Sequence, residues 1–398
     1  MLVGLARRNF PGLEDKVFLD SACVSLAPVD AQQAISRFTE MAVRCPARDA
    51  SHHHLEMDRQ RTEAAREVAK LLHAEQRHVA LIESTSHGLN LAAQAIRLEP
   101  GSNVLVPDTE FMQVAIPWQG LREVEVRPVR SEPGGVLTVE AFERAMDAHT
   151  RVVCVSSVQW CTGYRLDMRR LGELCRERRI WLVVDAIHEI GAMRVDVRER
   201  YSDFLITGGH KWLNAPFGCG LMVVSDRVLE ELRPPSHGYL SMEPPPEGWG
   251  QYFRTPSVTP FEDHHFVREA RAFEHGGTAN YPGAIGLGAS VRLLNTLGVD
   301  QAEAHIRALT DRLRSELLRI GARLLTPEDA ASRSGLTVFR WFDEPAKDQA
   351  LVERLLDRKI YVSMRFTSGV GGIRVSTHFF NDETDIDRLV RELQALTA

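Results

Sequence analysis

The chain has 398 residues, 44% of them hydrophobic and 26% charged, with a formal net charge of −6 at pH 7. No apolar stretch reaches the roughly 18–20 residues that span a bilayer, and the N-terminus lacks the apolar core of a signal peptide. Six scattered cysteines without paired spacing and a mildly acidic charge balance favour a cytoplasmic protein that acts on small molecules and binds neither membrane nor nucleic acid.

Strand and helix patterns alternate from about residue 64 to residue 225. Short β-rich runs predict strands at 78–82, 103–107, 123–129, 151–158, 181–186, 203–209 and 219–225. Amphipathic or small-residue runs predict helices at 63–72, 87–96, 113–121, 139–147 and 168–178. Because the strand runs are largely apolar and mostly separated by helices, we expect an α/β fold with a mostly parallel sheet wrapped by helices.

A proline-rich segment at 233–260 interrupts this alternation. It holds seven of the nineteen prolines, together with Trp249, Tyr252 and Phe253. Flexible linkers are polar and poor in aromatic residues. We therefore expect an ordered excursion from the body of the protein, one that could cover a pocket.

Helices and strands are segregated in the remainder of the chain. Helices are predicted at 283–296, 300–320, 348–357 and 383–396, and strands at 335–342, 360–363 and 372–376. Asn381 and Asp382 provide an N-cap for the last helix. We expect an N-terminal arm and large domain over residues 1–275 and a smaller C-terminal α+β domain over residues 276–398.

Chemistry that needs a primary amine has few places to go, because only five of the 48 basic residues are lysines: Lys16, Lys70, Lys211, Lys347 and Lys359. Lys211 alone follows a predicted strand in a glycine-rich turn, and Asp185 lies at the end of another predicted strand. Ligands of open α/β sheets bind at the carboxyl ends of strands. A buried lysine is partly neutral and can form an imine, and a carboxylate can keep a pyridine nitrogen protonated.

Six segments carry a resemblance to a known family. They are VFLDSA (compare YLDNAA), STSHGLN (T-E-A-I-N), DAIHEIG (D-x-x-Q…G), GGHKW (S-x-HK), EHGGTAN (E-x-GT-x-N) and RVSTHFFN (R-x-S-x-H). In this order they resemble the class V aminotransferase, or cysteine desulfurase-like, branch of the fold-type I enzymes that use pyridoxal 5'-phosphate (PLP). The resemblance covers nearly the whole chain, and it implies that fold, PLP as cofactor and an amino-acid substrate.

The resemblance also implies roles in binding the cofactor. Lys211 would form the Schiff base with PLP and move the α-proton, and Asp185 would pair with the pyridinium. Ser86 and His87 would bind the phosphate at a helix N-terminus, where backbone N–H groups favour an anion. His210 would complete the phosphate site.

Further implied residues concern the substrate and a second subunit. Arg374 would clamp the substrate carboxylate with its planar fork, and His54 lies where the family often has a histidine near the substrate. Thr278 would reach the phosphate of a neighbouring subunit, which implies a homodimer with shared active sites. No metal is expected, because the histidine runs at 52–54 and 264–265 lack partners at ligand spacing.

Several positions depart from the family pattern. Phe111 stands where the family has a histidine that stacks on the cofactor ring, and Phe can stack but cannot carry a proton. His188 replaces the glutamine that touches the ring oxygen, and Gly208 replaces a serine of the phosphate site. Gln159 falls near the region that contacts the ring oxygen, or it belongs to the core. One extra residue precedes Thr278.

The reaction is constrained by a missing thiol. Cysteine desulfurases need a cysteine shortly before the R-x-S motif, but no cysteine follows Cys219. Desulfuration through an enzyme persulfide is therefore not expected, and the pattern is closer to the isopenicillin N epimerase-like and C–S lyase relatives. We expect a lyase that eliminates a thiol from a cysteine S-conjugate. The alternatives are an epimerase or aminotransferase on the same scaffold, and a cofactor-binding protein that has lost catalysis.

Overall fold

The computed structural model describes residues 2–261 and 263–397. Its central sheet has seven strands in the order β2-β8-β7-β6-β5-β3-β4. The strands are β2 (Val79–Ile82), β3 (Asn103–Pro107), β4 (Glu125–Val129), β5 (Thr150–Ser156), β6 (Trp181–Asp185), β7 (Phe204–Gly208) and β8 (Gly220–Val224). All neighbouring strands run parallel except at β8, which is antiparallel to both of its neighbours. The expected α/β fold with a mostly parallel sheet is confirmed.

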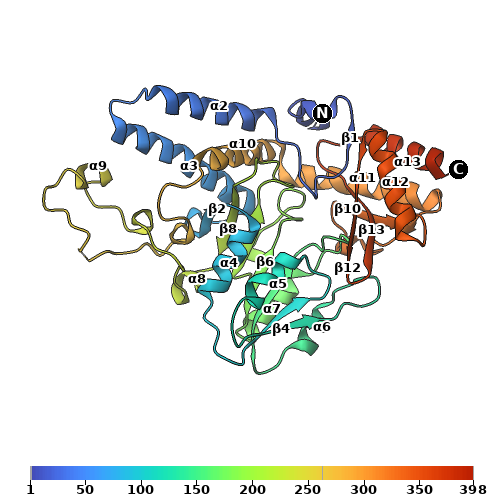
Figure 1. Cartoon of the computed structure of the whole chain (residues 1–398), viewed down its shortest axis with the longest axis horizontal. Coiled ribbons are helices and arrows are strands. Elements are labelled where there is room, and N and C mark those ends of the chain that lie inside the picture. The colour runs from blue at the N-terminus through green and yellow to red at the C-terminus, as the bar shows by residue number, and fades with distance from the viewer. Residues whose placement is uncertain (1, 262, 398) are drawn as a thin grey trace.

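Helices cover both faces of this sheet (Figure 1). Alternate strand residues point to opposite faces, so Leu182 and Val184 lie in one buried cluster and Val183 in another. The first cluster lies under α3 (Ala50–Leu72), α6 (Val139–Ala145), α7 (Met168–Glu177) and α10 (Tyr281–Leu297). The second lies under α4 (Thr85–Ala95), α5 (Met112–Gln119) and α8 (Asp226–Glu231). In addition, α2 (Val29–Arg44) packs against α10.

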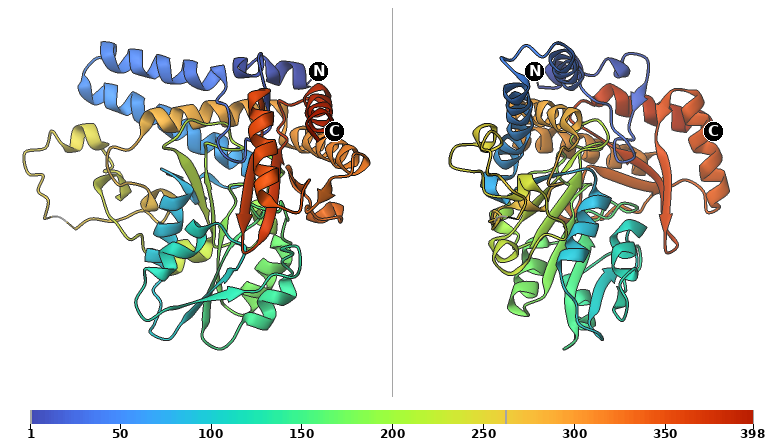
Figure 2. Two further views of the ribbon diagram at one scale, coloured as in Figure 1. Left: turned by 45° about the vertical axis from the view of Figure 1, so that its right-hand side comes forward. Right: turned by 60° about the vertical axis from the view of Figure 1, so that its left-hand side comes forward.

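The proline-rich segment projects from the body, as Figures 1 and 2 show. It contains only short helical turns, η4 (Tyr239–Ser241) and α9 (Trp249–Tyr252). Trp249 stacks on Phe253 with ring centroids 5.7 Å apart. Together with residues of α3, the segment borders a cavity of about 800 Å³. The aromatic residues of this excursion therefore pack on one another and line a pocket.

A second, antiparallel sheet has the order β12-β13-β10-β9. Its strands are β9 (Arg323–Leu324), β10 (Leu336–Arg340), β12 (Ser363–Thr367) and β13 (Val370–Ser376), accompanied by α11 (Val299–Arg319), α12 (Pro345–Asp357) and α13 (Glu383–Thr397). Separately, β1 (Val17–Phe18) pairs with β11 (Ile360–Tyr361). The strand expected at 360–363 is thus two strands, and β12 escaped prediction because polar side chains alternate with apolar ones in Ser363–Thr367. The boundary at 275/276 stays a prediction.

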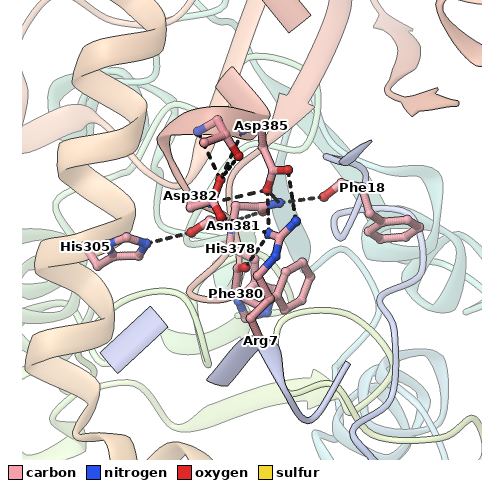
Figure 3. A network of polar contacts seen from close by, with 9 residues as sticks. Arg7, Phe18, His305, His378, Phe380, Asn381, Asp382 and Asp385 are labelled. Carbon is pink, nitrogen blue, oxygen red and sulfur yellow. Dashed lines mark hydrogen bonds and ion pairs between the residues drawn. The ribbon is translucent and has the colours of Figure 1, made fainter. Parts of the chain in front are cut away.

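Polar contacts tie the N-terminal arm to the C-terminal segment (Figure 3). Arg7, at the end of α1 (Leu2–Arg7), donates from Nη1 to Oδ2 of Asp385 at 2.9 Å and from Nη2 to Oδ1 at 3.3 Å. Asn381 donates to the Phe18 carbonyl at 3.0 Å. Asp382 accepts from the backbone N–H groups of Thr384 and Asp385, which confirms the expected N-cap. Of the described helices, none has the length and apolarity needed to cross a bilayer.

We expect Glu189→Ala to lower the free energy of unfolding by roughly 3–5 kcal/mol, because it leaves buried guanidinium groups without their counterion. Glu189 is fully buried and accepts from Arg200 Nη1 at 2.6 Å, Arg200 Nη2 at 2.7 Å and Arg165 Nε at 3.0 Å. Urea unfolding measures the loss. The control is Glu173→Ala, whose partner Arg169 is exposed, and it should cost about 0.5 kcal/mol or less. Equal losses in the two variants would contradict this assignment.

The same pair makes stability depend on pH. Burial by itself would raise the pKa of Glu189, but Arg200 and Arg165 outweigh it and lower that pKa from 4.5 to about 2. A carboxyl with a depressed pKa in the folded state stabilises that state fully only above its unfolded pKa. The contribution is therefore complete above about pH 4.5 and is lost as the pH falls toward 2.

Candidate active site

Neighbouring strand ends bring the predicted amine and carboxylate together. Asp185 is the last residue of β6 and Gly208 the last of β7, and these strands are adjacent and parallel. Lys211 lies in the short connection from β7 to β8. Ser156, at the end of β5, lies opposite Asp185. The carboxyl ends of three strands thus form one side of the site, as expected for an open α/β sheet.

A histidine stands beside the amine. Lys211 Nζ lies 3.5 Å from Nε2 of His188, and Trp212 Nε1 lies 3.3 Å from Nδ1 of the same ring. An indole N–H can only donate, so Nδ1 accepts and a neutral His188 carries its proton on Nε2. Burial, with further contributions from nearby cations, lowers the pKa of His188 well below its ordinary value. His188 is therefore a neutral donor that faces the amine.

Burial shifts both key groups toward their neutral forms. It lowers the pKa of Lys211 to about 8, an effect that Asp185 opposes and Arg374 reinforces. It raises the pKa of Asp185 to about 6, although the Ile187 N–H donates to Oδ1 at 2.9 Å and Lys211 adds a smaller opposing effect. A cationic ring nitrogen next to Asp185 would restore its charged form. The site can thus supply a nearly neutral amine and a carboxylate suited to a cation.

The N-terminus of α4 and Gly208 form a cradle. Ser84 caps the helix by accepting from the His87 N–H at 3.1 Å, which leaves the N–H groups of Thr85 and Ser86 without a hydrogen-bond partner in the described chain. Thr85 Oγ1 accepts from the Gly208 N–H at 2.8 Å. A Cβ at Gly208 would lie only 3.0 Å from Nδ1 of His210 and 3.2 Å from Thr85 Oγ1. Glycine therefore keeps open a space where free N–H groups favour an anion, which fits a phosphate.

Arg374 enters the site from β13. Its side chain is 2% exposed, and it donates from Nη1 to the Trp160 carbonyl at 3.0 Å and from Nη2 to Asp20 Oδ1 at 3.4 Å. Its Nε is buried and has no partner among the described residues. Burial lowers the pKa of Arg374, and Asp20 opposes that shift. An incompletely satisfied buried guanidinium suits an anionic ligand.

Phe111 and Gln159 occupy different environments. Phe111 is 44% exposed and meets Trp160 edge-on, with ring centroids 5.4 Å apart. Gln159 is fully buried and donates to Glu110 Oε1 at 2.9 Å while it accepts from Thr109 Oγ1 at 3.1 Å. The structure therefore places Gln159 in a buried network, with one amide hydrogen left over.

Glu110 is a buried acid to which the motifs assigned no role. It accepts from the N–H and the hydroxyl of Ser156 at 2.7 and 2.5 Å. Burial raises its pKa to about 7, and the charge of Asp185 contributes to the increase. The available signal was its place directly before Phe111. Its carboxyl links the end of β5 to the segment that carries Phe111.

Two predicted residues lie away from Lys211 in this chain. His54 lines the cavity bordered by the excursion, where its Nε2 is 3.5 Å from the Tyr281 hydroxyl. Thr278 is exposed, in the turn just before α10. Within the part of the chain that the structure describes, no group of three or more His, Cys, Asp or Glu residues could hold a metal ion.

A thiol that the motifs did not single out also reaches the site. Cys23 is exposed, and Arg365 Nη2 donates to its Sγ at 3.4 Å. Arg374 and Lys211 are close enough for Cys23 to influence their pKa values. The signal was its position directly after the VFLDSA motif. The segment before Arg374 lacks a cysteine, but the N-terminal arm supplies one.

Known proteins resemble the chain over most of its length. The family model for aminotransferase class-V matches residues 17–389. A probable cysteine desulfurase of Methanothermobacter thermautotrophicus is 28% identical over 406 residues, covering 98% of this chain and 97% of that protein. Isopenicillin N epimerase of Streptomyces clavuligerus is 29% identical over 350 residues, 84% of each chain. The solved complex of the cystine C–S lyase C-DES with cysteine persulfide has a TM-score of 0.83 at 20% identity, covering 96% of this chain and 98% of that one.

The fold, the cofactor and the family can be inferred from these observations. The amine, the carboxylate and the anion cradle fit PLP, and the structural likeness is that of the fold-type I enzymes. The family model spans nearly the whole chain. The protein therefore belongs to the class V aminotransferase family of PLP-dependent enzymes.

Proposed function

We propose that this enzyme is a C–S lyase that acts on a cysteine S-conjugate by α,β-elimination. The proposal rests on the amine of Lys211 beside His188, 3.5 Å apart, in a site whose β12–β13 hairpin brings Arg374 but no thiol. A thiol on that segment is what a desulfurase needs to accept sulfur. Without it, the sulfur leaves with the substrate's own substituent.

The side chains divide the work. PLP, when bound, draws off the electrons of a bond broken at the substrate α-carbon. Lys211 holds the cofactor and takes the α-proton, Asp185 keeps the ring nitrogen protonated, and Phe111 covers the ring. His188 donates from Nε2 to the ring oxygen, to which Gln159 offers its remaining amide hydrogen.

Anion-binding groups hold the two ends of the bound molecules. The N-terminus of α4, with Ser86, His87 and His210, holds the phosphate, and Arg374 holds the substrate carboxylate. Departure of a thiolate from the β-carbon and hydrolysis by water then yield a thiol, pyruvate and ammonia.

An epimerase or aminotransferase is the second candidate, and the 29% identity to isopenicillin N epimerase favours it. Both reactions use the same amine, carboxylate and arginine clamp. They differ from elimination only in the fate of the α-proton once it has been removed: an epimerase returns it to the other face, and an aminotransferase transfers it within the cofactor–substrate pair.

Product analysis with a panel of cysteine S-conjugates tests the proposal. We expect equal amounts of thiol, pyruvate and ammonia. Exchange of the α-hydrogen in deuterated water without thiol release would instead identify an epimerase, and a keto acid that retains its sulfur an aminotransferase. Formation of alanine with sulfur transferred to Cys23 would identify a desulfurase, and any of these three results would overturn the lyase proposal.

A homodimer with shared active sites is part of the same proposal. The exposed Thr278 and the cavity-lining His54 do not meet Lys211 within one chain. A second subunit that contributes Thr278 to the phosphate and His54 to the substrate would give both residues a role.

A further inference from the structure

A second arginine faces the substrate side of the site. In the β12–β13 pair, Ser363 lies directly opposite Arg374, and Arg365 follows two residues along β12. Directly opposed residues of an antiparallel pair, and residues two apart on one strand, share a face of the sheet. Arg365 and Arg374 therefore point to the same side, about 7 Å apart along the strand direction. Asp20 and Cys23 of the N-terminal arm contact this face, since Ser363 Oγ donates to Asp20 at 2.8 Å and Arg365 to Cys23.

The two guanidinium groups differ in how their charges are balanced. Arg374 forms an ion pair with Asp20 at 3.4 Å. Arg365 is half-buried and forms no ion pair within the described residues 2–261 and 263–397. Its hydrogen bonds run to the Met364 carbonyl at 2.8 Å and to Cys23 Sγ at 3.4 Å. Thiol sulfur is a weak acceptor, so an anion that displaced it would gain a charge-assisted bond.

Nearby groups confirm that Arg365 belongs to the site. Among the influences on the pKa of Lys211, Arg365 contributes a lowering smaller than those of burial and Arg374. It also helps to oppose the increase that burial causes in the pKa of Asp20. The hairpin tip is anchored to the large sheet by Ser368 Oγ, which donates to the Asp108 carbonyl at 2.5 Å. Arg365 is thus held over the active site with an unbalanced positive charge.

We propose that Arg365 binds a second anionic group, at the end of the substrate's side chain, while Arg374 binds the α-carboxylate. The assignment rests on the proposed function and narrows its substrate class to amino acids whose side chain ends in a carboxylate or a similar oxyanion. A planar guanidinium fork matches the two oxygens of such a group. A cysteine S-conjugate with a terminal carboxylate meets both requirements.

Two matched ligands test this assignment. S-carboxymethylcysteine carries the second carboxylate, and its carboxamide analogue has nearly the same shape without the charge. Titration of the holoenzyme, followed by its visible absorbance, gives the Kd of each. We expect the native enzyme to bind the carboxylate about 10-fold more tightly or better, and Arg365→Gln to weaken only that ligand until the two Kd values agree within about twofold.

Further variants separate the possible outcomes. Arg365→Lys, which keeps the charge but loses the fork, should retain an intermediate preference and serves if the glutamine variant does not fold. Arg323→Gln, on the exposed edge strand β9 and paired with Asp343, should leave both Kd values unchanged. No preference in the native enzyme, or equal weakening of both ligands by Arg365→Gln, would overturn the assignment. Because binding is measured apart from turnover, tight binding without thiol release would reject the lyase reaction and leave the role of Arg365 standing.

Discussion

Replacement of Lys211 by alanine is expected to remove the visible absorbance of the purified enzyme and to lower kcat by about 10²–10⁴-fold or more. Lys211 is the amine at the carboxyl end of β7, and burial lowers its pKa to about 8, so a useful fraction is neutral near physiological pH. The substitution removes both the covalent attachment of PLP and the group that moves the α-proton. An absorbance spectrum and an assay of thiol release measure the two losses.

Lys347→Ala is the matched control. Lys347 is exposed on α12, where it pairs with Glu344 at 2.8 Å. Its removal should change neither the spectrum nor the rate. If the Lys211→Ala spectrum were instead identical to that of the native holoenzyme, the placement of the cofactor on Lys211 would be wrong.

Asp185→Asn should leave the cofactor bound but reduce kcat by roughly 10²–10³-fold, the scale seen when one preorganised electrostatic group is removed from an active site. The amide retains the shape of the carboxylate and can still accept from the Ile187 N–H, which lies 2.9 Å from Oδ1. It lacks the negative charge that holds the ring nitrogen protonated, so the ring becomes a poorer electron sink. Steady-state kinetics together with the cofactor content of the variant measure the effect.

Asp203→Asn controls for the loss of a buried carboxylate as such. Asp203 accepts from the Leu182 N–H at 2.9 Å and from Ser225 Oγ at 3.1 Å, outside the site. It should lower stability and leave kcat within about twofold. A comparable drop in kcat in both variants would show that Asp185 acts through folding and not through the ring nitrogen.

Local patterns determined most of the large sheet. Every strand expected between residues 78 and 225 is present, because short apolar runs bounded by polar turns can be read from a few neighbouring residues. The reversal of β8 was also open to prediction: its connection to β7 spans only residues 209–219 and contains no helix, whereas a parallel crossover usually needs a dozen residues or more. Lys211 lies in this short connection, so the reversal and the placement of the amine share one cause.

Sequence motifs were also sufficient to find Lys211, Asp185 and Arg374, because each lies in a contiguous segment whose residue types and spacing are informative by themselves. Gln159 was open to two interpretations, and its buried contacts with Glu110 and Thr109 were visible only once β5 and the segment at 109–111 were adjacent. The sequence likewise held Cys23 and Arg365 more than 300 residues apart, with nothing to relate them.

The tertiary structure alone decided which of these segments meet. The N-terminal arm crosses to the C-terminal sheet, where Arg7 and Asn381 hold it, and this brings Asp20 and Cys23 to the arginines of β12 and β13. It also set His54 apart from Lys211 in the single chain. Periodicity and motifs report on neighbours along the chain, whereas the charge balance of a site depends on contacts between distant segments, which exist only after the two sheets have packed.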